Sequence, residues 1–271
     1  MIYELVPKPF KNAYKKLYWK VYYNFMASYS AKYGAVVYPR QFMNYGYATS
    51  DDIGMKLGSE TSQELQIKSY LNLMQNAPID GKAVIEIGCG KGGGCNLFYT
   101  HFKPKKIVGV DISKENIVIC QKRYKDTSIE FLQGDAEKQI FPNNSFDVVL
   151  NLESSHCYPL RIAFFKNVYS ILNKDGYFLY VDLFWSTQDT LDIEKQLTET
   201  GFKFIKKEDI TQNIVLSLEL QGDRNKDILK KLKYLKSFGF MKNIIATTDS
   251  VTYAGFKNGP IKYMLYVLKK E

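Results

Sequence analysis

Apolar positions follow a helical spacing near the N-terminus, and short unbroken apolar runs occur from residue 82 onward. Over residues 8–29 apolar side chains recur every three or four positions, which predicts an amphipathic helix: Phe10, Tyr14, Leu17, Val21 and Phe25. We expect this stripe to face the core. The alternatives are that the helix gates a lipid-accepting pocket or touches a membrane surface. A second helix is predicted over about residues 60–75.

Strands and helices alternate in the middle of the chain. Short apolar and branched runs predict buried strands at 83–87, 106–110, 129–132, 146–150 and 177–181. Helices are expected between them, ending near residue 101 and covering about 113–124 and 161–172. Ser113 is expected to cap its helix, and Asn173–Gly176 to form the turn before the fifth strand. Repeated strand–helix units of this length predict a parallel sheet with helices on both faces.

The remaining third of the chain adds elements to this sheet. The pattern predicts a helix near 191–200, a strand near 202–206, helices through 211–238 and a strand at 261–268. A long connection and a Gly-Pro turn precede the last strand, which suggests that it is inserted antiparallel. The sequence thus predicts a doubly wound α/β fold with four segments: an N-terminal helical lid (1–75), a core (76–210), a helical cap (211–256) and the final core strand (257–271).

Composition limits the class of protein. The 271 residues are 45% hydrophobic and 15% aromatic, which excludes a disordered or fibrous chain. No apolar run is long enough to span a bilayer, and the N-terminus does not resemble a signal peptide. The four cysteines form no Cys-x-x-Cys pair, so neither a disulfide framework nor a metal site is expected. We expect a cytoplasmic protein.

The charge balance says something about partners. Lys and Arg number 37 against 28 Asp and Glu, a net charge of +9, but arginine occurs only at 40, 123, 161 and 224. Nucleic-acid recognition depends heavily on the guanidinium group, so nucleic acid is not expected as a partner. A solvated lysine-rich surface explains the charge, and an acidic membrane surface or an anionic substrate is the alternative.

A glycine-rich segment between the first strand and its helix carries the strongest functional signal. Glu86–Gly94 contains glycines where a turn needs positive φ and where a ligand must approach the backbone, and the helix that follows presents free N–H groups. Gly88, Gly90 and Gly93 also satisfy a dinucleotide fingerprint. Asp111 ends the second strand, where a carboxylate can accept both ribose hydroxyls of an adenosine-bearing cofactor. Glu86 favours a cofactor that carries an ammonium group.

In this order, the motifs resemble those of the class I S-adenosylmethionine-dependent methyltransferases. Besides the glycine-rich segment and Asp111, the resemblance rests on Gly134–Glu137, Phe146–Asn151 and the Lys-Asp-Gly-Tyr turn. It implies a seven-stranded sheet with the last strand antiparallel. It also implies S-adenosylmethionine as the cofactor.

The resemblance implies roles at the methionyl end of this cofactor. Gly88, Gly90 and Gly92 would let the methionyl part approach the backbone. Glu86 would support its ammonium group, and Asn151 would lie beneath the sulfonium.

At the adenosine end the resemblance assigns four further positions. Asp111 would hold the ribose, and Ile112 would pack on the adenine. Asp135 and Ala136 would contact the edge of the base.

The segment after the fourth strand points to the acceptor. Asn151–Pro159 resembles the matching segment of the phthiotriol/phenolphthiotriol dimycocerosate methyltransferases, which O-methylate a long lipid alcohol. Phe42–Tyr47 and Lys262–Tyr266 agree with this subfamily. Sterol C-methyltransferases also carry a Glu and a His after strand four. The resemblance therefore implies a hydrophobic small-molecule acceptor without identifying it.

The chemistry of methyl transfer nominates particular side chains. Transfer from a sulfonium is an in-line displacement, and an aliphatic alcohol attacks well only if its proton is removed. His156 is the candidate base, and the alternative is that it only shapes its loop; the other histidine, His101, is expected to be structural. Glu153 is expected to orient His156, bind the acceptor hydroxyl or merely cap the loop.

Two tyrosines before the core are candidates for a lid. Tyr45 and Tyr47, with Asn44, are expected to close on the methionyl end of the cofactor, or else to pack as ordinary core residues. Attack from carbon or nitrogen remains open, as does a nicotinamide-dependent reductase suggested by the glycine pattern. The sequence also leaves open a homodimer.

Overall fold

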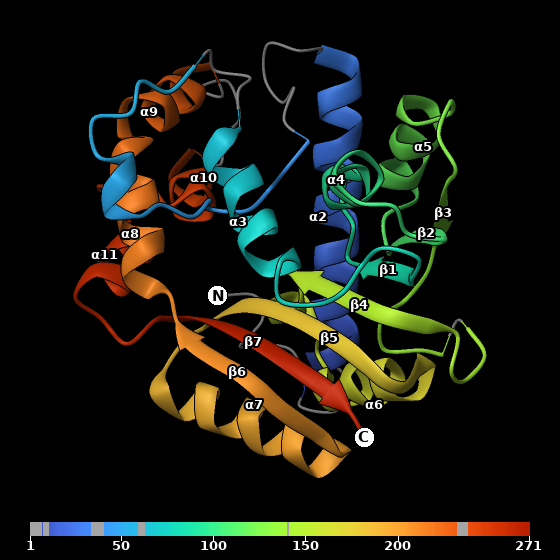
Figure 1. Ribbon diagram of the computed structural model, residues 1–271. Helices are drawn as coiled ribbons and strands as arrows, with labels where there is room; N and C mark the ends of the chain where they lie inside the picture. The colour runs from blue at the N-terminus through green and yellow to red at the C-terminus, as the bar shows by residue number, and fades with distance from the viewer. Residues whose placement is uncertain (1–6, 8–10, 34–40, 59–62, 140, 232–237) are drawn as a thin grey trace.

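A seven-stranded sheet forms the centre of the molecule. The computed structural model describes residues 7, 11–33, 41–58, 63–139, 141–231 and 238–271. The strands run in the order β3-β2-β1-β4-β5-β7-β6 (Figure 1). Their bounds are β1 Ala83–Ile87, β2 Lys106–Asp111, β3 Ile129–Gln133, β4 Phe146–Leu152, β5 Leu172–Phe184, β6 Phe202–Asp209 and β7 Lys262–Lys270. Strands β1 to β5 pair in parallel, and β7 is antiparallel to both β5 and β6. The predicted doubly wound sheet with an antiparallel last strand is confirmed.

Helices cover both faces because the central strands are apolar on both sides. Every residue of β1 is buried, as expected for a parallel strand between two helical layers. One core cluster joins the sheet to α3 (Glu64–Met74), α4 (Gly93–His101), α5 (Lys114–Arg123), α8 (Thr211–Leu220) and α11 (Val251–Lys257). The other joins it to α6 (Arg161–Ile171) and α7 (Thr187–Thr200). The sheet therefore lies between two helical layers.

Local signals placed most element boundaries well, with two differences. The Ser113 hydroxyl accepts a hydrogen bond from the N–H of Asn116 at 3.2 Å, which confirms the predicted cap of α5. Strand β5 begins at Leu172, before the predicted turn, so residues 173–176 form a bulge inside the strand. Helix α7 begins at Thr187, earlier than predicted, because Ser186 caps it by accepting from the N–H of Asp189.

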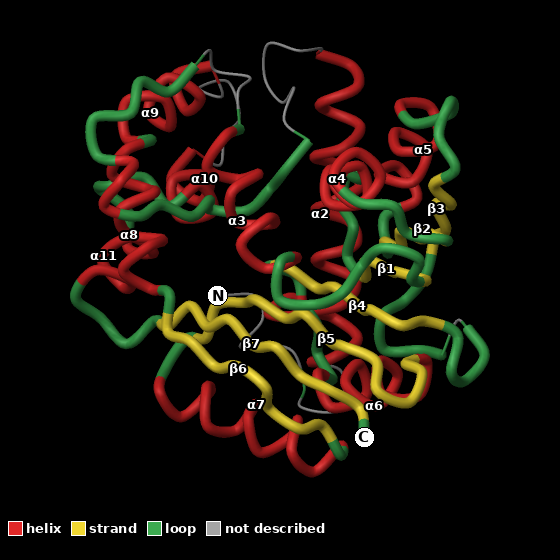
Figure 2. The backbone as a smooth tube through the Cα atoms, viewed as in Figure 1, coloured by secondary structure: helices red, strands yellow, loops and turns green. Residues whose placement is uncertain are grey.

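The predicted helical run at 211–238 is divided among separate helices. These are α8, α9 (Gly222–Lys231) and α10 (Phe238–Ile245), and α11 follows before β7. Figure 2 shows them grouped together beside α3, away from the far edge of the sheet formed by β3. The division into lid, core, cap and final strand stays a prediction.

The orientation predicted for the N-terminal helix is wrong. In α2 (Lys11–Tyr33) the side chains of Leu17, Val21 and Phe25 are 61%, 57% and 52% exposed, whereas Trp19 and Tyr23 face a cavity. The reason is that this helix carries large apolar rings on more than one face, so a spacing of three and four does not identify the buried side. Phe10 lies outside the described residues.

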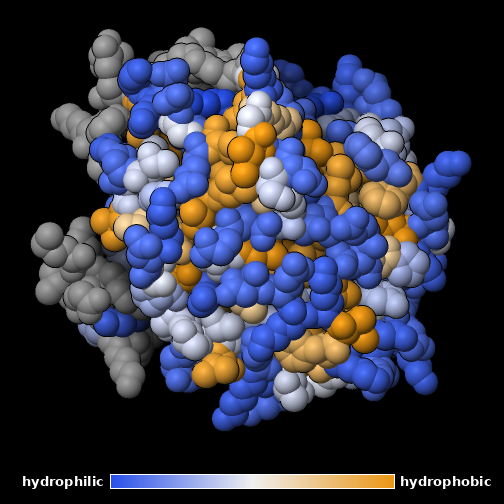
Figure 3. All heavy atoms as spheres, turned by 60° about the vertical axis from the view of Figure 1, so that its left-hand side comes forward, coloured by the Kyte–Doolittle hydropathy of each residue, from blue (hydrophilic) through white to orange (hydrophobic). Residues whose placement is uncertain are grey.

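One face of the molecule is largely polar. On the face shown in Figure 3, hydrophilic side chains predominate and hydrophobic ones gather near its upper centre. Within the described ranges, no helix combines the length and the apolar character needed to cross a membrane.

All four cysteines are buried free thiols.

Candidate active site

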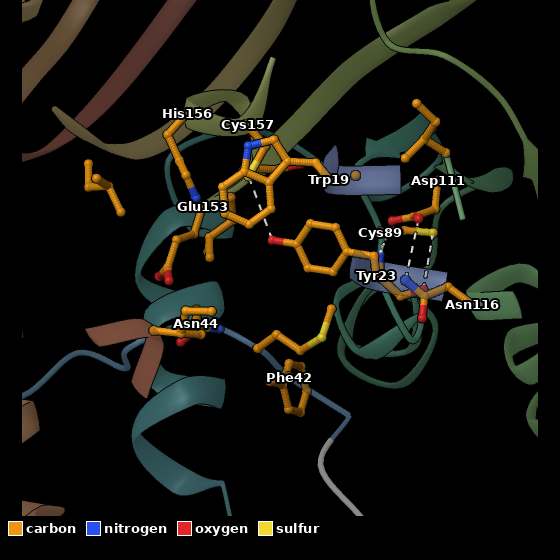
Figure 4. Close-up of a pocket in the computed structure, with 18 of the residues that line it drawn as sticks. Trp19, Tyr23, Phe42, Asn44, Cys89, Asp111, Asn116, Glu153, His156 and Cys157 are labelled. Carbon is orange, nitrogen blue, oxygen red and sulfur yellow. Dashed lines mark hydrogen bonds between the residues drawn. The ribbon is translucent and has the colours of Figure 1, made fainter. Parts of the chain in front are cut away.

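A cavity of about 380 Å³ lies at the carboxyl ends of the parallel strands. Its wall comes from α2, the segment 41–45, the loops after β1 to β4, and parts of α8 to α10. Open α/β sheets bind ligands at this edge because the chain leaves β1 and β4 toward opposite faces there. Figure 4 shows Asp111 and Asn116 at one side of this cavity and Glu153 and His156 at the other, with Tyr23 between them.

The glycine-rich loop after β1 forms part of the wall. Gly88 has φ +76°, and a Cβ there would lie 2.1 Å from the Ser154 hydroxyl oxygen, so no other residue fits without movement. Gly88 and Gly90 line the cavity. Gly92 sits behind them as the residue that caps α4. The backbone of the loop is therefore open to a ligand at two of the three predicted glycines.

Glu86 lies beneath this loop and does not reach the cavity wall. Its carboxylate accepts hydrogen bonds from the Tyr70 hydroxyl at 2.8 Å and the Cys95 thiol at 3.2 Å. Burial raises the pKa of Glu86 to about 7, which favours its protonated form at pH values below neutral. Within the described part of the chain it forms no ion pair. A cationic group bound above the loop would keep this carboxylate charged.

Asp111 is the last residue of β2 and lines the cavity. Its carboxylate accepts from the N–H groups of Gly90 and Ser113 at 2.9 and 2.8 Å, and from the Asn116 amide at 3.3 Å. Burial raises the pKa of Asp111 to about 6 despite these donors. Ile112 follows it on the cavity wall.

The loop after β3 brings Asp135 and Ala136 to the same wall. Lys16 of α2 forms ion pairs with Asp135, at 2.9 Å, and with Glu137. Helix α2 therefore contacts the loop that the sequence assigns to the adenine.

At the other side, His156 is held by a buried carboxylate. His156 lies in a short 3₁₀ turn after β4, and its Nδ1 is 2.7 Å from Oδ1 of Asp182 in β5. Asp182 is fully buried and accepts three more hydrogen bonds, from the Ser155 hydroxyl and from the N–H groups of His156 and Leu183. Burial alone would raise the pKa of Asp182, but the imidazole and the other donors hold it below its usual value.

This contact also sets the charge of the histidine. Burial alone would lower the pKa of His156, but the neighbouring Cys157 and Asp182 raise it well above the ordinary value. With Nδ1 bonded to Asp182, the other ring nitrogen is left for a ligand. The contact with Asp182 therefore favours the protonated form of the imidazole, in which both ring nitrogens donate.

Glu153 is the second titratable group on this side. It has φ +50°, a conformation that is costly for a residue with a side chain and is often found at functional sites. Its Oε2 accepts from the N–H of Tyr45 at 3.0 Å and from the Tyr263 hydroxyl. Burial raises the pKa of Glu153 to about 8, although the hydrogen bond from Tyr263 and the charge of His156 oppose this.

The structure brings most predicted site residues to one cavity but leaves four behind its wall. The wall contains Gly88, Gly90, Asp111, Ile112, Asp135, Ala136, Glu153, His156 and Tyr45. Glu86 and Gly92 lie under the loop. Asn151 is fully buried, and its amide donates to the Ile87 carbonyl at 2.7 Å. Tyr47 packs against the hydrophobic core. The functional roles stay predictions.

Sequence reasoning missed two parts of this site. Trp19 and Tyr23 of α2 reach the side of the cavity that holds Glu153 and His156, called the acceptor side here, whereas the side of Asp111 is the donor side. The Trp19 and His156 rings pack edge to face with their centroids 6.5 Å apart, and the Tyr23 hydroxyl is 3.6 Å from the Cys157 thiol. No signal in the helix pattern separated these rings from the exposed ones. Asp182 was also missed, although a lone acid inside the apolar run 177–184 could have revealed it.

Comparison with known proteins gives one consistent result. Residues 85–180 match a family described as "Methyltransferase domain". The chain is 33% identical over 192 residues to a fatty-acid O-methyltransferase of Mycolicibacterium smegmatis, which covers 70% of each protein. It is 28% identical over 235 residues to a phthiotriol/phenolphthiotriol dimycocerosates methyltransferase of Mycobacterium tuberculosis, which covers 85% of each.

A solved structure shares the fold. The cyclopropane synthase MmaA2 from Mycobacterium tuberculosis superposes with a TM-score of 0.67 at 17% identity, over 85% of this chain and 92% of that one. The described residues also fit a sulfonium cofactor with an ammonium group, because the buried carboxylates of Glu86 and Asp111 lie beside a glycine-rich loop that lines the cavity.

Proposed function

Because the chain belongs to the class I S-adenosylmethionine-dependent methyltransferases, we propose that it methylates an oxygen atom of a long hydrophobic acceptor held beside His156. The observation that carries this proposal is His156 on the cavity wall, across from the glycine-rich loop, with its Nδ1 held by the buried carboxylate of Asp182. The cofactor is S-adenosylmethionine, and the enzyme acts on lipids. Oxygen as the nucleophile, and the roles of the side chains, are the proposal.

The donor side holds the cofactor through the groups already described. The open backbone at Gly88 and Gly90 would receive the methionyl part, and Glu86 beneath it would balance the ammonium charge. Asp111 would accept the ribose hydroxyls, and Asp135, which pairs with Lys16, would lie at the adenine edge. When bound, the cofactor supplies a methyl group on a positively charged sulfur.

The acceptor side prepares the oxygen nucleophile. With Asp182 fixing Nδ1, the free nitrogen of His156 is oriented to take the proton of an acceptor hydroxyl as the oxygen attacks. This role requires a neutral imidazole, and the raised pKa of His156 means that the neutral form increases with pH. Methylation of an alcohol is therefore expected to speed up as the pH rises toward that pKa.

A carboxylic acid is the second candidate acceptor, and the charge on His156 favours it. A carboxylate is already deprotonated, so it needs no base, and the imidazolium would pair with it. The relative from Mycolicibacterium smegmatis is named for methylation of fatty acids. Ester formation would then fall as the pH rises through the pKa of His156, the opposite trend to that of an alcohol.

Other nucleophiles have less support. Attack from carbon or nitrogen stays an alternative, since solved structures that share the fold, at 16–18% identity, include a geranyl diphosphate C-methyltransferase and an N-methyltransferase of Haemonchus contortus. The nicotinamide-dependent reductase suggested by the glycine pattern is set aside because the family matched is that of methyltransferases.

The test is transfer of an isotope-labelled methyl group. Purified protein, labelled S-adenosylmethionine and either a long-chain alcohol or a long-chain fatty acid are incubated, and lipid products are analysed by mass spectrometry. Label on an oxygen atom supports the proposal. Alkaline hydrolysis separates the two acceptors, because it releases label from an ester and not from an ether. A wider panel of acceptors is tested in the same way. If label is found only on carbon or nitrogen atoms, the proposal of oxygen methylation is overturned.

A further inference from the structure

We infer that the outer face of α2 binds an anionic lipid surface, so that the helix covering the cavity also places the enzyme where hydrophobic acceptors reside. This inference rests on the proposed lipid acceptor. It concerns a surface of the enzyme, whereas the proposed function concerns the interior of the cavity.

The two faces of α2 are both apolar but point in different directions. At about 100° per residue, Leu17 and Val21 lie on one side of the helix, and Trp19 and Tyr23 lie on the other. The first pair is 61% and 57% exposed, whereas the second pair lines the cavity. Phe25, 52% exposed, continues this row into the next turn, so the outer face carries an apolar patch of three large side chains, and contiguous apolar patches mark interaction surfaces.

The charges of the helix identify what covers it. The helix contains no Asp or Glu and five lysines, of which Lys16 is paired with Asp135 and Glu137 on the inner side. Lys11 and Lys20 fall on either side of the exposed aliphatic pair at helical spacing. Lysine beside aliphatic and aromatic side chains is the composition of helices that lie in the interface of anionic membranes. A protein partner with an apolar groove would not require this excess of positive charge.

The neighbouring helix extends the same surface. Helix α5 packs against α2, and the Ser113 hydroxyl that caps α5 is 2.6 Å from Asn24 of α2. On α5, Val118 is exposed, and so are Lys114 and Lys122. Apolar and cationic side chains therefore continue beyond α2.

The inner face connects this surface to the site. Lys16 pairs with Asp135 on the donor side, and Tyr23 and Trp19 contact the Cys157–His156 turn on the acceptor side. A lipid reaching the cavity past α2 would leave the surface bound by the outer face of the same helix. The bound surface would thus lie against the helix that forms one wall of the cavity.

Vesicle sedimentation with the full chain tests the inference. We expect the protein to bind phosphatidylglycerol-containing vesicles at least tenfold more tightly than pure phosphatidylcholine vesicles, with weaker binding at high salt. The double variant Leu17→Gln/Val21→Gln should lose at least tenfold in binding. The matched control, Ile205→Gln/Val251→Gln, removes aliphatic side chains that are 52% and 79% exposed elsewhere, and should bind like the parent.

Several outcomes overturn the inference. These are no binding of the parent to anionic vesicles, equal loss in both double variants, or a parent dimer that the Leu17/Val21 variant dissociates without any vesicle binding. Binding of S-adenosylhomocysteine by each variant checks that it is folded. Methyl transfer to a short acceptor dissolved in buffer is measured in parallel. If that transfer fails while the protein still binds vesicles, the proposed function is contradicted but the inferred lipid-binding surface is not.

Discussion

The two sides of the cavity are built in different ways. The donor side consists of loops that leave β1, β2 and β3 directly, so its residues lie within a few positions of a strand end. The acceptor side combines segments far apart in the chain: Trp19 from α2, His156 after β4, Asp182 in β5 and Tyr263 in β7. A donor site of this kind can serve many acceptors, because the acceptor side can change without altering the strand ends.

The comparison predicts that the largest effect on chemistry comes from the acceptor side. His156→Ala should lower kcat by about 100- to 10,000-fold for an alcohol acceptor, because it removes the proposed base. Affinity for S-adenosylhomocysteine should stay within about threefold of the parent. Steady-state kinetics and calorimetry measure the two quantities. His101→Ala, at an exposed histidine, is the matched control; equal kcat in the two variants would remove the base role.

Asp111→Ala should act on the donor side instead. It removes a carboxylate proposed to accept two ribose hydroxyls, at a cost of about 3 kcal/mol or about 100-fold in cofactor affinity. Equilibrium dialysis with labelled cofactor measures this loss, and Asp126→Ala, at an exposed aspartate, is the control. A change below threefold would show that Asp111 does not contact the cofactor.

Glu86→Gln should make the protein more stable but weaken its binding of the cofactor. The pKa of Glu86 is raised from 4.5 to about 7 in the folded chain, so ionisation of this group destabilises the fold increasingly from pH 4.5 to 7 and fully above that. The glutamine should therefore raise the free energy of unfolding by about 1–3 kcal/mol at pH 8, and by little at pH 4.5.

The same variant should bind the cofactor more weakly. In the parent, affinity should rise as the pH increases through about 7, because the carboxylate must be ionised to attract the ammonium group. In Glu86→Gln this rise should shrink, with about tenfold lower affinity at pH 8. Urea unfolding and cofactor titration across pH check both statements. A destabilised variant with unchanged affinity would contradict them.

The smallest expected effect is that of Trp19→Ala. Its ring contacts His156 and lines the acceptor side, so KM for a soluble acceptor should rise about three- to tenfold while cofactor affinity stays constant. Tyr18→Ala, at the exposed neighbour, is the control for loss of an aromatic ring from α2. A cofactor affinity that falls together with acceptor KM would place Trp19 at the donor side.

This contrast between the two sides also explains what could be predicted from the sequence. Strand runs, the Ser113 cap and the glycine-rich loop depend on neighbours in the chain, and the structure has them where the sequence indicates. The inner face of α2 and the Asp182–His156 contact depend on which distant segments meet, and a single sequence carries little of that information. Asn151, which the resemblance places beneath the sulfonium, lies buried behind the cavity wall with its amide donating to the Ile87 carbonyl, and its role stays a prediction.

The central claim is that the buried carboxylates and the open glycine loop form a site for a sulfonium cofactor. Isothermal titration calorimetry of S-adenosylhomocysteine into the folded full chain tests it most directly. The account predicts one molecule bound per chain with micromolar affinity, lost in Asp111→Ala and kept in His156→Ala. Absence of binding heat at several temperatures, from protein shown to be folded, would contradict it.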